Sequence, residues 1–155
     1  MPGYKGHLCG GLIAYVVVFF FCLTTRPSLL TACEWLFCTL AGSLFPDIDV
    51  KSKGQKYFYY VVMVLFLFLL SQEKFQLLSC VSILAITPML SRHRGLFHKA
   101  WFLITISIIG WLIIGGIFPN LRSLLLQHSL FFCLGALSHL VLDRVQASIK
   151  KGVSR

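Results

Sequence analysis

Residues 100–118 have the sequence AWFLITISIIGWLIIGGIF, a stretch of 19 residues that contains no acidic or basic side chain. A helix needs about 20 residues to cross the roughly 30 Å hydrocarbon core of a bilayer, and spans as short as about 17 residues occur. This stretch therefore predicts a membrane-spanning helix. The whole chain has the same character, because its 155 residues are 57% hydrophobic and only 12% charged, with a mean hydropathy of +0.84. A soluble domain of this length could not bury so much apolar surface, whereas lipid accepts it directly.

Five further apolar runs with few charges accompany this stretch: residues 8–23, 29–45, 57–70, 75–91 and 124–142. The runs that begin at residues 8, 57 and 75 are at or below the minimum length for a span unless flanking residues extend them. The sequence therefore predicts an all-α, polytopic membrane helix bundle with about six transmembrane helices, and four or five remain as alternatives. Because the runs leave no room for a separate soluble domain, residues 1–155 are expected to form a single integral-membrane domain.

The positive charges predict how the bundle is oriented. The chain has 14 Lys and Arg residues against 5 Asp and Glu residues, which gives a net charge of +9. Eleven of the basic residues lie before the first run, in 46–56, in 92–99 or after the last run, and only Arg26, Lys74 and Arg122 lie in the other connections. Short basic loops stay in the cytoplasm, so both termini are expected to be cytoplasmic. The net positive charge is then mostly a signal of membrane topology. The expected partner is the lipid bilayer, and no nucleic-acid partner is expected.

Most of the groups able to bind a metal ion or move a proton fall on this same cytoplasmic face. Seven of the ten acids and histidines are expected at the cytoplasmic ends of the spans, and they are His7, Asp47, Asp49, His93, His98, His139 and Asp143. Single residues of this kind are common at a wet interface, but a group of ionisable residues at membrane depth favours a functional site. His128 and Glu34 are expected nearer the opposite face, as packing or hydrogen-bonded residues.

The local spacing of these residues is chemically consistent with a metal site. In SHLVLD, His139 and Asp143 are four positions apart, so on a helix they share one face and can bind the same ion. In PDID, Asp47 and Asp49 are two positions apart, which in an extended turn would direct both side chains the same way. Imidazole and carboxylate ligands together suit Zn²⁺, Mn²⁺ or Fe, and carboxylate-rich subsets suit Mg²⁺. Arg94 could hold an anionic phosphoryl or carboxylate group through its planar guanidinium.

Four motifs, taken in order along the chain, resemble the YdjM family of membrane-bound metal-dependent hydrolases, of the LexA-regulated inner-membrane type. The motifs are GH at 6–7, LFPDID at 44–49 followed by KSKGQK at 51–56, HRGLFH at 93–98, and GALSHLVLD at 135–143. The resemblance implies a multi-span protein of the bacterial cytoplasmic (inner) membrane. It also implies a distant relation to zinc phospholipases C, and hence phosphoester cleavage by metal-activated water.

Carried over residue by residue, the resemblance implies metal ligands at His7, Asp47, Asp49, His93, His98, His139 and Asp143. Arg94 matches the arginine of the H-R-G motif. The chain departs from the family pattern at two places, because Phe97-His98-Lys99 stands for T-H-S and Val50 stands for the histidine that usually follows D-I-D. Neither departure removes a proposed ligand, but the missing hydroxyl groups could weaken the support around the ligands and change the substrate or the activity.

The function expected from these observations is hydrolysis of phosphoesters, including lipid-derived ones, by metal-activated water at the cytoplasmic membrane face. The cofactor is a divalent ion, with zinc the first choice and manganese, iron or magnesium as alternatives. Asp47 or Asp49 would orient the water or act as base, and Arg94 would neutralise charge that develops on the substrate. A non-catalytic metal-binding scaffold or a transporter stays open as an alternative, although transporters usually place their polar groups near the bilayer midplane. The sequence leaves the substrate and the oligomeric state open.

Overall fold

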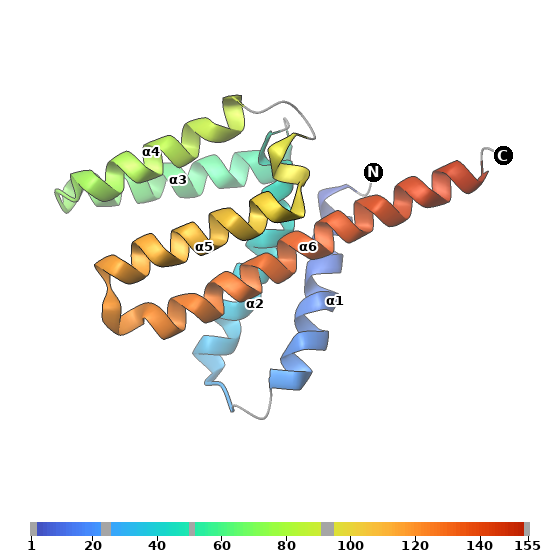
Figure 1. Cartoon of the computed structure of the whole chain (residues 1–155), viewed down its shortest axis with the longest axis horizontal. Helices are drawn as coiled ribbons and strands as arrows, with labels where there is room; N and C mark the ends of the chain where they lie inside the picture. Colours follow the sequence, from blue (N-terminus) through green and yellow to red (C-terminus); the bar gives the residue numbers. More distant parts are fainter. Residues whose placement is uncertain (1–2, 23–25, 50–51, 91–94, 154–155) are drawn as a thin grey trace.

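The computed structural model of the chain describes residues 3–22, 26–49, 52–90 and 95–153, which are helical apart from short connections. No strand occurs among these residues, so the predicted all-α polytopic bundle is confirmed. The α-helices are α1 (Tyr4–Cys22), α2 (Leu29–Leu44), α3 (Lys53–Ser71), α4 (Phe75–Leu90), α5 (Ala100–Ile117) and α6 (Arg122–Val153). Three short 3₁₀ helices join them, namely η2 (Phe45–Asp49), η3 (Leu96–His98) and η4 (Pro119–Leu121) (Figure 1).

Helix length decides which elements can cross a bilayer. Five segments of the described chain are long and apolar enough to do so, and they are Tyr4–Cys22, Leu29–Ile48, Lys53–Ser71, Ala100–Ile117 and Pro119–Gly152. Flanking residues lengthen α1 and α3 to 19 residues each, so these two short apolar runs become full spans. Helix α4 has only 16 residues and contains Pro88. At 1.5 Å per residue it is about 24 Å long, which is shorter than the roughly 30 Å hydrocarbon core.

Helix α6 is the central element of the bundle. It packs against α1, α2 and α5, while α3 and α4 form a neighbouring antiparallel pair (Figure 1). The apolar run 124–142 underestimates its length, because α6 has 32 residues and continues past the other helices to Val153. A helix of that length spans about 48 Å, well beyond the hydrocarbon core, and its polar C-terminal turns, which include Lys150 and Lys151, are the part expected outside the membrane.

The contact between α2 and α6 is made backbone to backbone by two glycines. A Cβ atom added to Gly135 would collide with the Thr39 carbonyl oxygen, and one added to Gly42 would collide with the Phe132 carbonyl oxygen. Small residues allow this close approach, which is the usual basis of helix association in membranes. The approach places the end of α2 directly against the middle of α6.

Aromatic side chains fill the space where α1, α2 and α6 meet. Tyr15, Trp35 and Phe131 form a buried cluster in which the Trp35 and Phe131 rings stack with centroids 4.7 Å apart. Apolar side chains on the outside of the bundle are exposed, and Leu29 and Phe20 are 84% and 70% exposed. In water this surface would be unfavourable, whereas in a bilayer it contacts lipid tails, as the composition predicts.

Candidate metal centre

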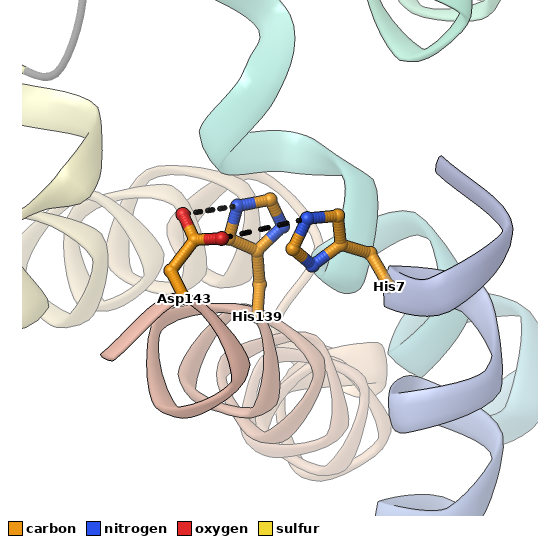
Figure 2. A group of neighbouring side chains, drawn as sticks. All are labelled: His7, His139 and Asp143. Carbon is orange, nitrogen blue, oxygen red and sulfur yellow. Dashed lines mark ion pairs between the residues drawn. The ribbon is translucent and has the colours of Figure 1, made fainter. Parts of the chain in front are cut away.

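Helix α6 supplies two residues of the site from successive turns. His139 and Asp143 lie on one face, with His139 Nε2 3.6 Å from Asp143 Oδ2. His7, from the first turns of α1, stacks on His139 with ring centroids 3.6 Å apart and planes 11° apart. Its Nε2 atom lies 3.7 Å from Asp143 Oδ1 (Figure 2).

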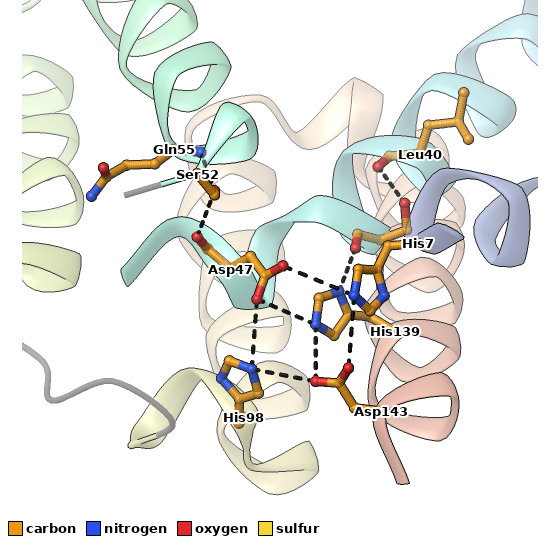
Figure 3. Close-up of polar contacts among 9 residues, drawn as sticks. His7, Leu40, Asp47, Ser52, Gln55, His98, His139 and Asp143 are labelled. Atoms are coloured by element: carbon orange, nitrogen blue, oxygen red, sulfur yellow. Dashed lines mark hydrogen bonds and ion pairs between the residues drawn. The ribbon is translucent and has the colours of Figure 1, made fainter. Parts of the chain in front are cut away.

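Two further residues complete the group from the short 3₁₀ helices. Asp47 in η2 places Oδ1 3.6 Å from His139 Nε2 and 3.7 Å from His98 Nε2. His98, the last residue of η3, also lies 3.7 Å from Asp143 Oδ2. Figure 3 shows the resulting cluster, in which two carboxylates face three imidazoles. We call these five residues, His7, Asp47, His98, His139 and Asp143, the His–Asp cluster.

A carbonyl group of α2 orients the imidazole at the middle of the cluster. His139 Nδ1 lies 2.7 Å from the Ser43 carbonyl oxygen, and both groups are buried. Ser43 is in the last turn of α2, where backbone carbonyls have no partner within the helix. Because a carbonyl can only accept, Nδ1 donates its N–H to the Ser43 carbonyl oxygen, and Nε2 is the ring nitrogen that faces the two carboxylates.

The segment that carries Asp47 is held by burial and by one serine. Pro46 and Ile48 are fully buried on either side of Asp47. Ser52, the N-cap of α3, donates its Oγ proton to the Asp47 carbonyl oxygen at 3.0 Å and accepts from the Gln55 N–H at 3.1 Å. The expectation of an extended PDID turn is wrong, because these residues form 3₁₀ helix η2. At three residues per turn, positions two apart do not share a side.

Phe97, the residue before His98, holds this part of η3 in place through its buried side chain. Its side chain is 0% exposed and packs edge-on against Phe45 and Phe102, with ring centroids 5.7 and 5.2 Å away. The phenylalanine that stands where the family pattern has threonine therefore replaces a hydroxyl group by apolar packing. This packing keeps η3 in place, with His98 facing the carboxylates of Asp47 and Asp143.

The separations within the His–Asp cluster suit a shared cation better than direct hydrogen bonds. The carboxylate-to-imidazole distances are 3.6, 3.7 and 4.0 Å, too long for hydrogen bonds. Two ligands of a tetrahedral zinc ion lie about 3.4 Å apart, because each is about 2.0–2.2 Å from the metal. Among the described residues, the buried atoms His139 Nε2 and Asp143 Oδ1 have no hydrogen-bond partner. Two neighbouring carboxylates also repel each other unless a cation lies between them. The residues therefore fit a divalent ion.

Burial within the cluster is one-sided. The His7 and His139 side chains are 1% and 0% exposed, whereas Asp143 and Asp47 are 14% and 26% exposed. The stacked imidazoles thus close the site toward the bundle. A cavity of about 320 Å³ adjoins the open side and is lined in part by His98 and Asp143. Water and a small substrate can reach Asp143 and His98 from this direction.

Three of the predicted site residues are not placed by the structure. His93 and Arg94 lie outside the described residues, and so does the side chain of Asp49. Their roles as ligands or catalytic groups stay predictions. The interpretation of His128 and Glu34 as hydrogen-bonded residues is confirmed, since His128 Nε2 lies 3.2 Å from Glu34 Oε2.

Ser43 and Ser52 are supporting residues that the sequence analysis missed. Ser52 could have been found, because Ser52 followed by Gln55 is the spacing of a helix N-terminal capping box. Ser43 acts through its backbone carbonyl, which leaves no signal in the residue type.

Replacing Ser52 by alanine is expected to weaken metal binding as well as helix α3. Loss of the cap should lower the free energy of unfolding by about 1 kcal/mol, and loss of support for Asp47 should reduce metal affinity about tenfold. Ser28→Ala is the matched control, because Ser28 caps α2 in the same way by accepting from Thr31 N–H at 3.2 Å, away from the cluster. Metal titrations of both variants test this. Equal metal affinities would contradict a role for Ser52 at the site.

Comparison with known proteins identifies one family. The model of a family described as YdjM inner membrane protein matches residues 1–153, so the resemblance drawn from the four motifs is confirmed. No curated protein and no solved structure matches the chain.

Proposed function

We propose that this chain, which belongs to the YdjM inner membrane protein family, is a membrane-bound metal-dependent hydrolase of phosphoesters. The observation that supports the proposal most is the His–Asp cluster itself. Its three imidazoles and two carboxylates come from α1, η2, η3 and α6, which are far apart in sequence. We further propose that the protein resides in the bacterial cytoplasmic membrane, with the cluster on the cytoplasmic face, where the basic loops are expected.

The ligand set favours zinc. Three imidazoles suit Zn²⁺, Mn²⁺ or Fe better than Mg²⁺, which prefers oxygen ligands. Two overlapping groups have ligand atoms within 4.8 Å of one another: His7, His139 and Asp143 form one, and Asp47, His98 and His139 form the other. Because both contain His139, we propose one ion held by most of the cluster. His93 and Asp49 could extend the set to a second ion.

The chemistry follows from which side chains are buried and which are open. A bound divalent ion would activate water and polarise the phosphoryl oxygen. Asp47 is the most exposed member of the cluster, at 26%, so it can accept the proton of the attacking water. Asp49 is the alternative base, and Arg94 is proposed to neutralise charge on the phosphoryl group. The hydrogen bond from His139 Nδ1 to the Ser43 carbonyl oxygen would hold the central imidazole in one orientation during the reaction.

Two other functions are compatible with a metal site. A transporter would place its polar groups near the bilayer midplane, whereas His7 lies in the first turn of α1, and Asp47 and His98 lie in short 3₁₀ helices that connect longer helices. A metal-binding scaffold would need the same His–Asp cluster as a hydrolase. Only an activity measurement separates these two.

The first test is elemental analysis of detergent-purified protein prepared without chelator, with wild type beside Asp47→Ala. We expect about one equivalent of zinc, manganese or iron in wild type and much less in the variant. Hydrolysis of p-nitrophenyl phosphate esters should then stop on chelation and resume when metal is restored. Metal-free wild type after metal is resupplied would contradict the proposal. Stoichiometric metal without hydrolysis of monoesters or diesters would favour the scaffold.

A further inference from the structure

The cavity beside the His–Asp cluster follows the extension of α6. One end is lined by His98 and Asp143, and the rest by residues that α6 presents beyond Asp143, including Arg144, Gln146 and Lys150. Its volume is about 320 Å³. In Figure 1 this part of α6 continues past the other helices toward the C-terminus. The cavity therefore connects the candidate metal centre with a positively charged helical face.

That face is a regular stripe of α6. Leu140, Asp143, Ala147 and Lys150 are three or four positions apart, and Arg144 follows Asp143 directly, so all border the same side of the helix. Lys150 is about 10 Å along the axis from Asp143. Side chains on a helix tend to lean toward its N-terminus, which from Arg144 and Lys150 is the direction of the metal centre.

The two cations are not used by the ion pairs of the fold. None of the ion pairs among the described side chains includes Arg144 or Lys150. By contrast, Lys53 and Arg122 each lie over an aromatic ring, 4.7 and 5.1 Å from its centroid. Two positive charges that line one cavity attract anions into it. The pattern thus calls for an anionic ligand in the cavity.

Topology alone does not explain this arrangement. Basic residues are favourable in the last turn of a helix and in cytoplasmic segments, which covers Lys150 and Lys151. Arg144 lies more than two turns before the end of α6 and directly beside a cluster residue. Its expected place in a cytoplasmic segment also favours a basic residue there, but neither effect accounts for a cavity between Arg144 and the cluster.

We infer that Arg144 and Lys150 bind the phosphate group of the substrate in this cavity, with Arg144 nearest the metal centre. This inference rests on the proposed hydrolase function and adds the specificity-determining residues to it. The guanidinium group of Arg144 can donate two parallel hydrogen bonds to phosphate oxygens, and Lys150 adds a point charge. Leu140 and Ala147 give the wall apolar patches that can contact the carbon part of the ester. A lipid phosphate and a water-soluble phosphate share this chemistry.

Calorimetric titration of metal-loaded protein with inorganic phosphate, and with phosphatidic acid in detergent micelles, tests the inference. Arg144→Gln and Lys150→Gln should each bind phosphate about tenfold more weakly, which corresponds to about 1.4 kcal/mol. Lys151→Gln is the matched control, because Lys151 is exposed, adjacent to Lys150 and outside the cavity lining. It removes the same charge and should leave the affinity nearly unchanged. Tighter binding of phosphatidic acid than of phosphate would indicate a lipid source, and equal binding a soluble one.

Metal content measured in the same samples separates this inference from the proposed function. Full metal content with weakened phosphate binding in both cavity variants supports it. Unchanged affinity in the double variant Arg144→Gln/Lys150→Gln would overturn it and leave the metal centre intact. An equal loss of phosphate affinity in Lys151→Gln would also overturn it, because the effect would then be a general electrostatic attraction between phosphate and the basic end of α6. Metal-free wild type would contradict the hydrolase instead, and the same titrations on that protein would still decide whether the cavity binds phosphate.

Discussion

Asp143→Asn is expected to remove the metal ion from the purified protein while the helix bundle stays folded. The two carboxylate oxygens of Asp143 lie 3.6–3.7 Å from Nε2 of His7, His98 and His139, so this residue faces all three imidazoles. Asparagine has the same shape but lacks the negative charge that attracts a divalent ion. Loss of a residue that merely supports a ligand costs roughly 10–100-fold in metal affinity, so loss of a ligand should cost more than about 100-fold.

Elemental analysis and thermal unfolding in detergent measure this effect. A ligand present at 100 times its dissociation constant stabilises the folded state by about 2.7 kcal/mol. Added zinc should therefore raise the unfolding temperature of wild type and leave Asp143→Asn unchanged. The matched control is Glu34→Gln, which removes a carboxylate that faces a histidine outside the His–Asp cluster, 3.2 Å from His128. If Asp143→Asn retained the wild-type metal content, the His–Asp cluster would not be the metal centre.

The helices were predictable because lipid makes hydrophobicity a direct signal of structure. Residues 100–118 and 29–45 correspond closely to α5 (Ala100–Ile117) and α2 (Leu29–Leu44). Hydropathy does not predict the end of a helix that continues beyond the membrane. Helix α6 continues to Val153 with polar and basic residues, and α3 begins at Lys53 because Ser52 caps it. These ends depend on capping and helix propensity, which hydropathy does not measure.

The grouping of five of the seven candidate ligands could be predicted from the sequence, and its geometry could not. The topology placed His7, Asp47, His98, His139 and Asp143 at one end of the bundle, and the structure brings these residues together. The spacing of His139 and Asp143 fixed their shared face. The stacking of His7 on His139 and the contact with the Ser43 carbonyl were not predictable, because both need the close approach of helices that are distant in sequence.

Gly135→Ala is expected to cause the largest loss of stability among small substitutions. The added methyl group would collide with the Thr39 carbonyl oxygen and would lie 2.8 Å from the Ser43 nitrogen, both of them backbone atoms of α2. A side chain could rotate away, but a helix backbone cannot, so α2 and α6 must separate. Overpacking typically costs about 1–3 kcal/mol, and we expect at least about 3 kcal/mol here because only backbone opposes the methyl group. Separation would also break the bond from His139 to the Ser43 carbonyl, so the variant should lose metal too.

Gly110→Ala is the matched control for this effect. Gly110 lies within α5, and a Cβ atom there would have no atom within 4 Å among the described residues, apart from the neighbouring backbone of α5 itself. Because alanine favours helix by about 0.5–1 kcal/mol relative to glycine, this variant should be as stable as wild type or slightly more stable. The unfolding temperature in detergent and the metal content should therefore decrease in Gly135→Ala alone. If both variants unfolded at the wild-type temperature with full metal, the close contact between α2 and α6 would not be what orients His139.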